Sequence, residues 1–286
     1  MTDSLCHKLT GKIMNSSLIL SITTFLYGAA ACAYLCGWIF KKNYLNHSGT
    51  YLTIVAIVLN TIGIVLRWIE SYEMGIGHAP LSNLYESLVF FSWTIAIIYI
   101  SIEYRYKNKT IGVFTMPLSF LSLAYASLPS VNENIQPLIP ALKSNWLIAH
   151  VFTCFLGYAG FALAFALSIM YLIKISNNRF GQILPDQRML DELTYQMIMF
   201  GFLFLTAGII TGAVWANSAW GAYWSWDPKE TWSLITWFIY ATVIHARLMR
   251  GWSGKHIAWI SIFGFFAVLF TYFGVNLLPG LHSYGQ

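Results

Sequence analysis

Long runs of apolar residues, separated by short polar stretches, dominate the chain from residue 18 to residue 277. A helix that crosses a membrane needs about 20 mostly apolar residues. Eight segments meet or approach this length: 18–40, 51–69, 87–104, 111–128, 146–173, 193–214, 231–249 and 257–277. Three of them have short uncharged cores, and we expect flanking residues such as Arg67-Trp68 and Arg247 to reach the membrane interface and extend these spans. The pattern predicts an all-α, polytopic integral membrane protein.

The amino-acid composition supports the same fold class. Of the 286 residues, 57% are hydrophobic and only 9% are charged, whereas soluble domains are about 25% charged. So few charges cannot cover a water-facing surface, and the excess apolar surface must contact membrane lipid. No polar stretch is long enough to form a second core, so we expect residues 1–286 to form a single membrane domain. We interpret the first apolar run as a retained helix, because no convincing signal-cleavage site precedes it.

The positive charges predict how the chain is oriented. Eleven of the sixteen Lys and Arg residues follow the first, third, fifth and seventh predicted helices: Lys41, Lys42, Arg105, Lys107, Lys109, Lys174, Arg179, Arg188, Arg247, Arg250 and Lys255. Cytoplasmic connections of membrane proteins carry the excess of Lys and Arg. We therefore place these connections inside and both termini on the outer side. This orientation explains the formal net charge of +5 without a nucleic-acid partner.

The predicted topology sorts the histidines by their side of the membrane. His78, His150 and His282 fall on the outer side, together with a tryptophan-rich loop at about 215–230. His245 lies within the helix predicted at 231–249, towards its inner end. Ionisable residues within spans are rare and mark functional sites. We favour a ligand role for His245, with a hydrogen-bonded structural histidine as the alternative.

The segment WANSAWGAYWSWDPKETWSLITW, residues 215–237, holds six of the twelve tryptophans. An aromatic belt at the membrane interface explains one or two of them. It does not easily explain Trp215, Trp220, Trp224 and Trp226 in one short stretch. The alternative, which we favour, is an apolar surface for a flat ligand, where each stacked ring contributes about 0.5–1.5 kcal/mol beyond its buried area.

Charged residues follow these tryptophans directly, in the order Asp227-Pro228-Lys229-Glu230. Asp227 fits a helix N-cap, and Pro228 and Glu230 fit the first helical turn. Capping therefore accounts for the two acids as well as a ligand contact does. Capping gives Lys229 no role, and its cation could pair with a ligand carboxylate.

His150 and His282 share the outer side with this aromatic segment. Taken singly, an interfacial histidine is more often structural, but two beside an aromatic surface suggest a shared ligand. Two neutral imidazoles on opposite faces of a macrocycle can bind haem iron axially. A metal ion without a macrocycle fits less well, because no cysteine or carboxylate joins these histidines at ligand spacing.

The stretch GHAPLSNLYESLVFFSW, residues 77–93, is unusually polar for the entry into a span. Ser82 or Asn83 can cap the helix, and Glu86 fits its first turn. A capped helix start explains most of this stretch. Whether His78 contacts a ligand stays open.

Two of these stretches carry a resemblance to a known family. The run WGAYWSWDPKETW resembles the WWD motif of the haem-handling membrane proteins of cytochrome c assembly. The run GHAPLSNLYESL is similar to the signature of the CcsA/ResC branch of System II. The eight spans and the placed histidines agree with that branch over essentially the whole chain.

The resemblance implies a function and site residues. The WWD segment would bind haem b on the outer face, with His150 and His282 as axial ligands of the iron. His245 would belong to a second haem site nearer the inner side. The remaining expected haem contacts are Trp215, Trp220, Trp224, Trp226, Asp227, Lys229 and His78. Catalytic residues stay unassigned, since the chain could form the thioether bonds of a holocytochrome c synthase or only present haem.

The resemblance also implies partners and a location. A CcsB/ResB-type membrane protein would complete the site at His245, and an apocytochrome c with a C-x-x-C-H segment would receive the haem. The chain has no dithiol pair, so a thioredoxin-like reductant would keep the receiving thiols reduced. The expected location is the bacterial inner membrane, with the thylakoid membrane as the alternative. Rival hypotheses are a CcmC-type protein that delivers haem to a chaperone and a small-molecule transporter or channel.

Overall fold

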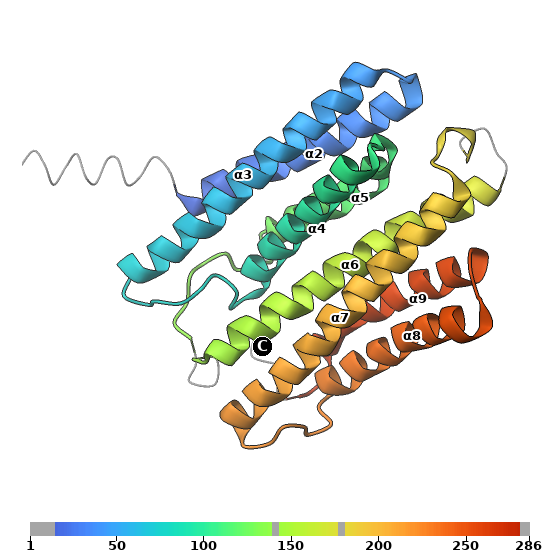
Figure 1. The fold of residues 1–286 in the computed structure, drawn as a ribbon. Helices are drawn as coiled ribbons and strands as arrows, with labels where there is room; N and C mark the ends of the chain where they lie inside the picture. The colour runs from blue at the N-terminus through green and yellow to red at the C-terminus, as the bar shows by residue number, and fades with distance from the viewer. Residues whose placement is uncertain (1–14, 139–142, 177–180, 281–286) are drawn as a thin grey trace, which may run out of the picture. The chain divides into compact units, whose positions relative to one another are not determined.

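The computed structural model describes residues 15–138, 143–176 and 181–280, which form eight α-helices and no β-strand (Figure 1). The helices are α2 (Ser16–Phe40), α3 (Asn43–Glu73), α4 (Leu84–Tyr106), α5 (Gly112–Ala126), α6 (Asn145–Ile175), α7 (Gln187–Trp220), α8 (Pro228–Arg250) and α9 (Lys255–Tyr272). Short 3-10 helices lie at η1 (Lys109–Ile111), η3 (Gly181–Ile183) and η4 (Gly274–Leu277). The all-α prediction is confirmed, and each of the eight predicted segments overlaps one helix, although the segment 257–277 continues past the end of α9 into η4.

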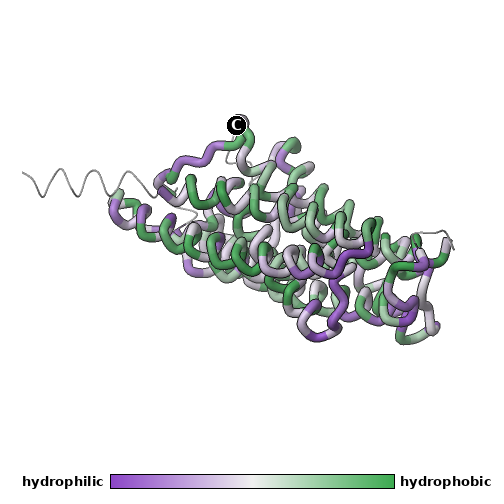
Figure 2. Tube along the Cα trace, turned by 90° about the horizontal axis from the view of Figure 1, so that it is seen from above, coloured by the Kyte–Doolittle hydropathy of each residue, from purple (hydrophilic) through white to green (hydrophobic). Residues whose placement is uncertain are grey.

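Six of these helices are long and apolar enough to cross a membrane, namely α2, α3, α4, α6, α7 and α9. Helix α5 has 15 residues, which span about 22 Å at 1.5 Å per residue. Figure 2 shows that the most hydrophilic stretches lie mainly in the connections and at helix ends. Large apolar side chains such as Phe25, Leu203 and Phe263 are exposed along the helices. Lipid is the solvent that favours such exposure, so the chain is a multi-pass membrane protein.

The helices form two compact units, Met1–Leu138 and Ile139–Gln286. In the first unit, α2 packs against α3 and α5, and α4 also packs against both. In the second unit, α6 packs against α7 and α9, and α8 also packs against both. Each unit is therefore a ring of four helices in which the first helix contacts the second and the fourth.

Glycines bring α6 and α7 close together in the second unit. A Cβ atom added at Gly201 of α7 would lie 2.6 Å from the Phe161 ring and 3.0 Å from the Gly157 carbonyl oxygen. Real Cβ atoms do not approach other atoms so closely, so this packing requires glycine. Phe161 in turn stacks on Tyr240 of α8, with ring centroids 3.6 Å apart. The same interface continues along α6 to His150.

Helix α7 extends beyond its predicted range of 193–214 at both ends. It begins at Gln187 and continues to Trp220, where Gly221 ends it with φ 78° and an N–H bond to the Asn217 carbonyl. A left-handed glycine is a common helix C-cap. Trp215 and Trp220 consequently lie on the last turns of α7, and only residues 221–227 form the connection to α8.

Candidate functional site

A capping box starts α8 directly after the tryptophans. The Asp227 carboxylate accepts the Lys229 backbone N–H at 3.0 Å. The Glu230 carboxylate accepts the backbone N–H groups of Asp227 at 3.2 Å and of Ser225 at 2.8 Å. Such reciprocal bonds satisfy donors that a helix start leaves unpaired. The capping interpretation of Asp227 and Glu230 is confirmed, and both carboxylates hold the connection in a fixed shape.

The four tryptophans divide into two pairs with different exposure. Trp215 is only 2% exposed and packs edge-on against Trp220, at a centroid distance of 4.8 Å. Trp224 and Trp226 form a second edge-on pair at 5.7 Å, and Trp226 is 69% exposed. The rings within each pair are steeply inclined, at 64° and 89°. The two rings of each pair therefore do not share one plane, and Trp215 contributes almost nothing to the surface.

His150 lies in the second turn of α6, where α7 holds its ring. Its Nδ1 atom is 2.7 Å from the Gly208 carbonyl oxygen, and its ring stacks on Trp215 at 6.0 Å and 14°. A carbonyl oxygen can only accept, so Nδ1 carries the proton and donates. In the neutral imidazole the Nε2 lone pair is then free of a proton. This is the tautomer that metal-binding histidines adopt, with the second nitrogen oriented by a backbone carbonyl.

Lys229, in the first turn of α8, interacts electrostatically with His150 and with Cys154, one turn further along α6. Its Nζ atom also donates to the Asn276 side-chain oxygen at 3.2 Å, in η4. The Lys229 cation thus lies where the start of α8 meets η4.

The segment after η4 brings Gly280 back to the start of α8. A Cβ atom added at Gly280 would lie 2.6 Å from the Asp227 carboxylate. Position 280 therefore lies against the start of α8. His282, two residues further along, lies outside the described residues.

His245 is exposed on α8, near the end opposite the tryptophan segment. Two turns away, Trp237 packs on Phe202 at 5.0 Å, and its indole N–H donates to Thr206 of α7 at 2.9 Å. Two residues beyond His245, Arg247 donates to the Asp191 carboxylate of α7 at 2.8 Å. These contacts fix α8 against α7 and leave the His245 imidazole exposed, pointing away from the helix packing of the second unit.

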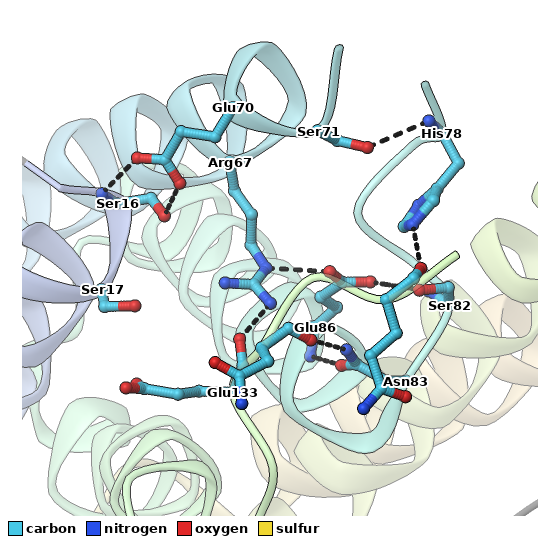
Figure 3. Close-up of polar contacts among 12 residues, drawn as sticks. Ser16, Ser17, Arg67, Glu70, Ser71, His78, Ser82, Asn83, Glu86 and Glu133 are labelled. Carbon is cyan, nitrogen blue, oxygen red and sulfur yellow. Dashed lines mark hydrogen bonds and ion pairs between the residues drawn. The ribbon is translucent and has the colours of Figure 1, made fainter. Parts of the chain in front are cut away.

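A buried ion pair in the first unit was missed by sequence reasoning (Figure 3). Arg67 is 3% exposed and Glu86 is 1% exposed, and their side chains bond at 2.8 Å. Arg67 also donates to the Glu133 carbonyl oxygen. The expectation that Arg67 reaches the membrane interface is therefore wrong, because its guanidinium is satisfied inside the protein. Burial of the two charges is tolerable because they are paired. The polar stretch GHAPLSNLYES could have indicated this pair, because it places the acid Glu86 in the first turn of α4.

His78 belongs to this polar network in the first unit. Its Nδ1 lies 2.9 Å from the Ala79 carbonyl oxygen, and its Nε2 lies 3.0 Å from the Gln136 carbonyl oxygen. Its backbone N–H donates to the Ser71 hydroxyl, as Figure 3 shows. Both ring nitrogens therefore face carbonyl oxygens of the same unit. The contacts give His78 a structural role, holding the segment that follows α5.

Sequence reasoning also missed the residues that hold His150. Gly208 and Gly212 of α7 face this histidine, and a Cβ atom at Gly212 would lie 2.6 Å from its Nδ1 atom. The spacing of Gly208, Gly212 and Trp215, by four and three residues, could have predicted that they share one face of a helix. Asn83, by contrast, caps α4 as predicted, accepting the Glu86 backbone N–H at 2.8 Å.

Residues 81–282 match the family described as Cytochrome C assembly protein. The chain is 41% identical to a protein of Guillardia theta named cytochrome c biogenesis protein CcsA, over 96% of this chain and 97% of that one. It is 44% identical to a protein of the same name from Prochlorococcus marinus, over 80% of this chain and 81% of that one.

The fold is similar to a solved structure named Cytochrome c Heme Lyase CcmF, with a TM-score of 0.67. The two are 15% identical, and the likeness covers 92% of this chain. This chain spans about half the length of that structure, 50%. At this identity the likeness concerns the fold alone.

Proposed function

This chain belongs to the cytochrome c assembly protein family, as a protein of the CcsA type, and we propose that it presents haem b for covalent attachment to apocytochromes c. Family membership itself gives a role in cytochrome c maturation. The finer proposal rests on the state of His150. Its Nδ1 proton is held by the Gly208 carbonyl at 2.7 Å, next to an aromatic segment and a cation. This arrangement suits a neutral axial ligand of haem iron.

We assign the second axial position of the outer site to His282. The support is the match to the family's order of histidines and the position of Gly280 against Asp227, close to Lys229. Two imidazoles that are far apart in the sequence of the second unit would then bind one iron atom from its two faces. Bis-histidine ligation holds the macrocycle without using its edge, where the vinyl groups lie.

The remaining groups of the site suit the rest of the haem. Trp220, Trp224 and Trp226 offer apolar faces and edges to the porphyrin. Lys229 is a cation where the start of α8 meets η4, and we assign it to a haem propionate. Asp227 contributes by fixing the connection through its capping box.

We place a second haem site at His245. The His245 imidazole is exposed on α8, and α7 holds this helix in place. It could therefore bind haem iron at an interface with a neighbouring chain. A CcsB/ResB-type membrane protein would supply the opposite ligand. Haem would pass from this inner site to the outer one.

Attachment itself joins two cysteine thiols of a C-x-x-C-H segment to the two vinyl groups. In each addition the S–C bond forms at one vinyl carbon and the thiol hydrogen ends on the other, so no external oxidant is needed. The thiols must be reduced beforehand, which assigns a part to a thioredoxin-like reductant. The peptide histidine then replaces one axial ligand, and the finished cytochrome leaves.

The proposal is tested by purifying the chain together with its CcsB/ResB-type partner and recording haem absorption spectra. We expect a low-spin, bis-histidine spectrum. His150→Ala and His282→Ala should each reduce the low-spin signal and cytochrome c maturation, while His245→Ala should remove a separate haem population. His47→Ala is a matched control, because His47 is exposed on α3 and its Nδ1 atom bonds the Asn43 carbonyl oxygen of the same helix turn. If His150→Ala and His282→Ala both retain haem and maturation at the level of that control, the proposed outer site is wrong.

A further inference from the structure

Helix α7 contacts His150 at three successive positions along one face. Gly208, Gly212 and Trp215 follow each other at spacings of four and three residues, which places them on the same side of a helix. Each makes a different contact with the imidazole. Together they restrict the position, tilt and tautomer of the ring.

Gly208 supplies the hydrogen-bond acceptor. Its carbonyl oxygen lies 2.7 Å from His150 Nδ1. A Cβ atom at this position would lie 2.5 Å from the Cys154 sulfur, so only glycine lets the α7 backbone approach α6 here. The close approach is what brings a main-chain carbonyl within reach of the imidazole.

Gly212 supplies the space that the ring occupies. A Cβ atom there would lie 2.6 Å from His150 Nδ1 and 2.8 Å from Cε1. Contacts below 3.0 Å require a shift, and the nearest atoms belong to the imidazole ring itself. A methyl group at residue 212 would therefore displace the ring from the Gly208 carbonyl.

Trp215 packs its indole face against the imidazole ring. Its indole is almost parallel to the imidazole, at 14°, and it is only 2% exposed. A buried indole that already stacks on His150 and packs edge-on against Trp220 offers little surface to a porphyrin. Its contacts suit it to hold the imidazole plane.

We infer that Gly208, Gly212 and Trp215 are positioning residues that hold His150 as a ready-made Nδ1-protonated ligand before haem arrives. The inference rests on the proposed haem site and changes the role of Trp215 from a haem contact to a brace for the axial ligand. Partners of this kind fix the orientation of a ligand and raise its basicity, and their loss costs about 10–100-fold in metal affinity.

The test compares Gly212→Ala with Gly201→Ala. Both positions face α6 from α7, and at both an added Cβ atom would come within 2.6 Å of a side-chain ring, His150 in one case and Phe161 in the other. We expect both variants to unfold at lower temperature. Only Gly212→Ala should lose low-spin haem from the outer site, with haem affinity lower by about 10–100-fold. Equal haem spectra in the two variants would overturn the inference.

Conservative and double variants separate a positioning role from a general packing defect. Trp215→Phe keeps a flat ring beside His150 and should retain more low-spin haem than Trp215→Leu. The loss of stability caused by Gly212→Ala should shrink in a His150→Ala background, because the clashing ring is gone. Additive losses of stability would contradict the contact between residue 212 and His150.

The single variants also separate the two proposals. Normal haem ligation in His150→Ala would overturn the proposed outer site. Normal ligation in Gly212→Ala, with loss in His150→Ala, would overturn only the positioning role.

Discussion

At the residue scale, Trp226 differs from the other tryptophans in its backbone. It adopts φ 60°, one of three non-glycine residues with positive φ among those described, together with Lys41 and Lys107. Left-handed backbone at a non-glycine residue costs about 1–3 kcal/mol and is concentrated at functional sites. Lys41 and Lys107 are helix C-caps, where this conformation is common. Trp226 has no such explanation, and its strained backbone holds an indole on the surface beside the proposed haem site.

We therefore expect Trp226→Gly to separate stability from function. Relief of the backbone strain, about 1–3 kcal/mol, should offset the lost edge-on contact with Trp224, about 0.5–1.5 kcal/mol. The free energy of unfolding should therefore change by about −0.5 to +2.5 kcal/mol, so that stability is kept or gained, while haem retention at the outer site falls. Thermal unfolding and haem spectra of the purified protein measure the two effects.

Lys41→Gly is the matched control, because it relieves the same backbone conformation at φ 54° without removing an indole. It should leave haem retention unchanged. A Trp226→Gly protein with full haem retention would show that the exposed indole does not contact haem.

At the element scale, the buried Arg67–Glu86 pair links α3 to α4 and to the segment after α5. Glu86 also accepts the Ser82 N–H and hydroxyl, at 2.9 and 2.8 Å, so its carboxylate is fully engaged. His78 and Arg67 hold that segment through backbone carbonyl oxygens, those of Gln136 and Glu133. The polar stretch at the entry to α4 thus organises one end of the first unit.

Removing one partner of this pair should be severe. Arg67→Ala leaves the Glu86 carboxylate buried without its cation, and breaking a buried pair in this way costs about 3–5 kcal/mol. Arg188→Ala is the control, because Arg188 pairs with Glu192 at the protein surface, where such pairs contribute about 0–1 kcal/mol. In detergent, Arg67→Ala should unfold at a clearly lower temperature than Arg188→Ala. Similar unfolding temperatures would mean that Arg67 is solvated in the protein.

The sequence predicted the helices well because their apolar runs are long. It predicted the cap at Asp227 and narrowed the cap of α4 to Ser82 or Asn83, because capping depends on neighbours in sequence. It failed where distant segments meet. The length of an apolar run does not show that Arg67 faces Glu86 and not the interface. Nor does it show that Gly212 lies against His150, since that contact depends on how closely α6 and α7 pack.

At the scale of the whole molecule, the ion pairs between helices lie near helix ends, whereas the contacts further along the helices are apolar or made by uncharged groups such as Asn60 and Trp237. In the second unit, the His150 end carries Lys229 and the tryptophan segment, and the other end carries the Asp191–Arg247 pair. Asp191 also accepts the Gly254 backbone N–H at 2.7 Å, which ties α7 to the start of α9. The two ends of this unit therefore have different chemistry, as proteins with two different aqueous faces require.

The orientation of these ends in the membrane is a prediction from the charges. Lys and Arg concentrate in the connections that follow α2, α4, α6 and α8 and in the helix ends beside them. These connections should therefore face the cytoplasm or its equivalent, with the tryptophan segment and both termini outside. Single cysteines at two exposed positions, Tyr223→Cys and Lys42→Cys, test this in a chain whose four native cysteines are replaced. A membrane-impermeant maleimide added to intact cells should label the first directly and the second only after permeabilisation. The reverse pattern would place the proposed haem-attachment site on the side where apocytochromes are made, and the outer-face proposal would then be wrong.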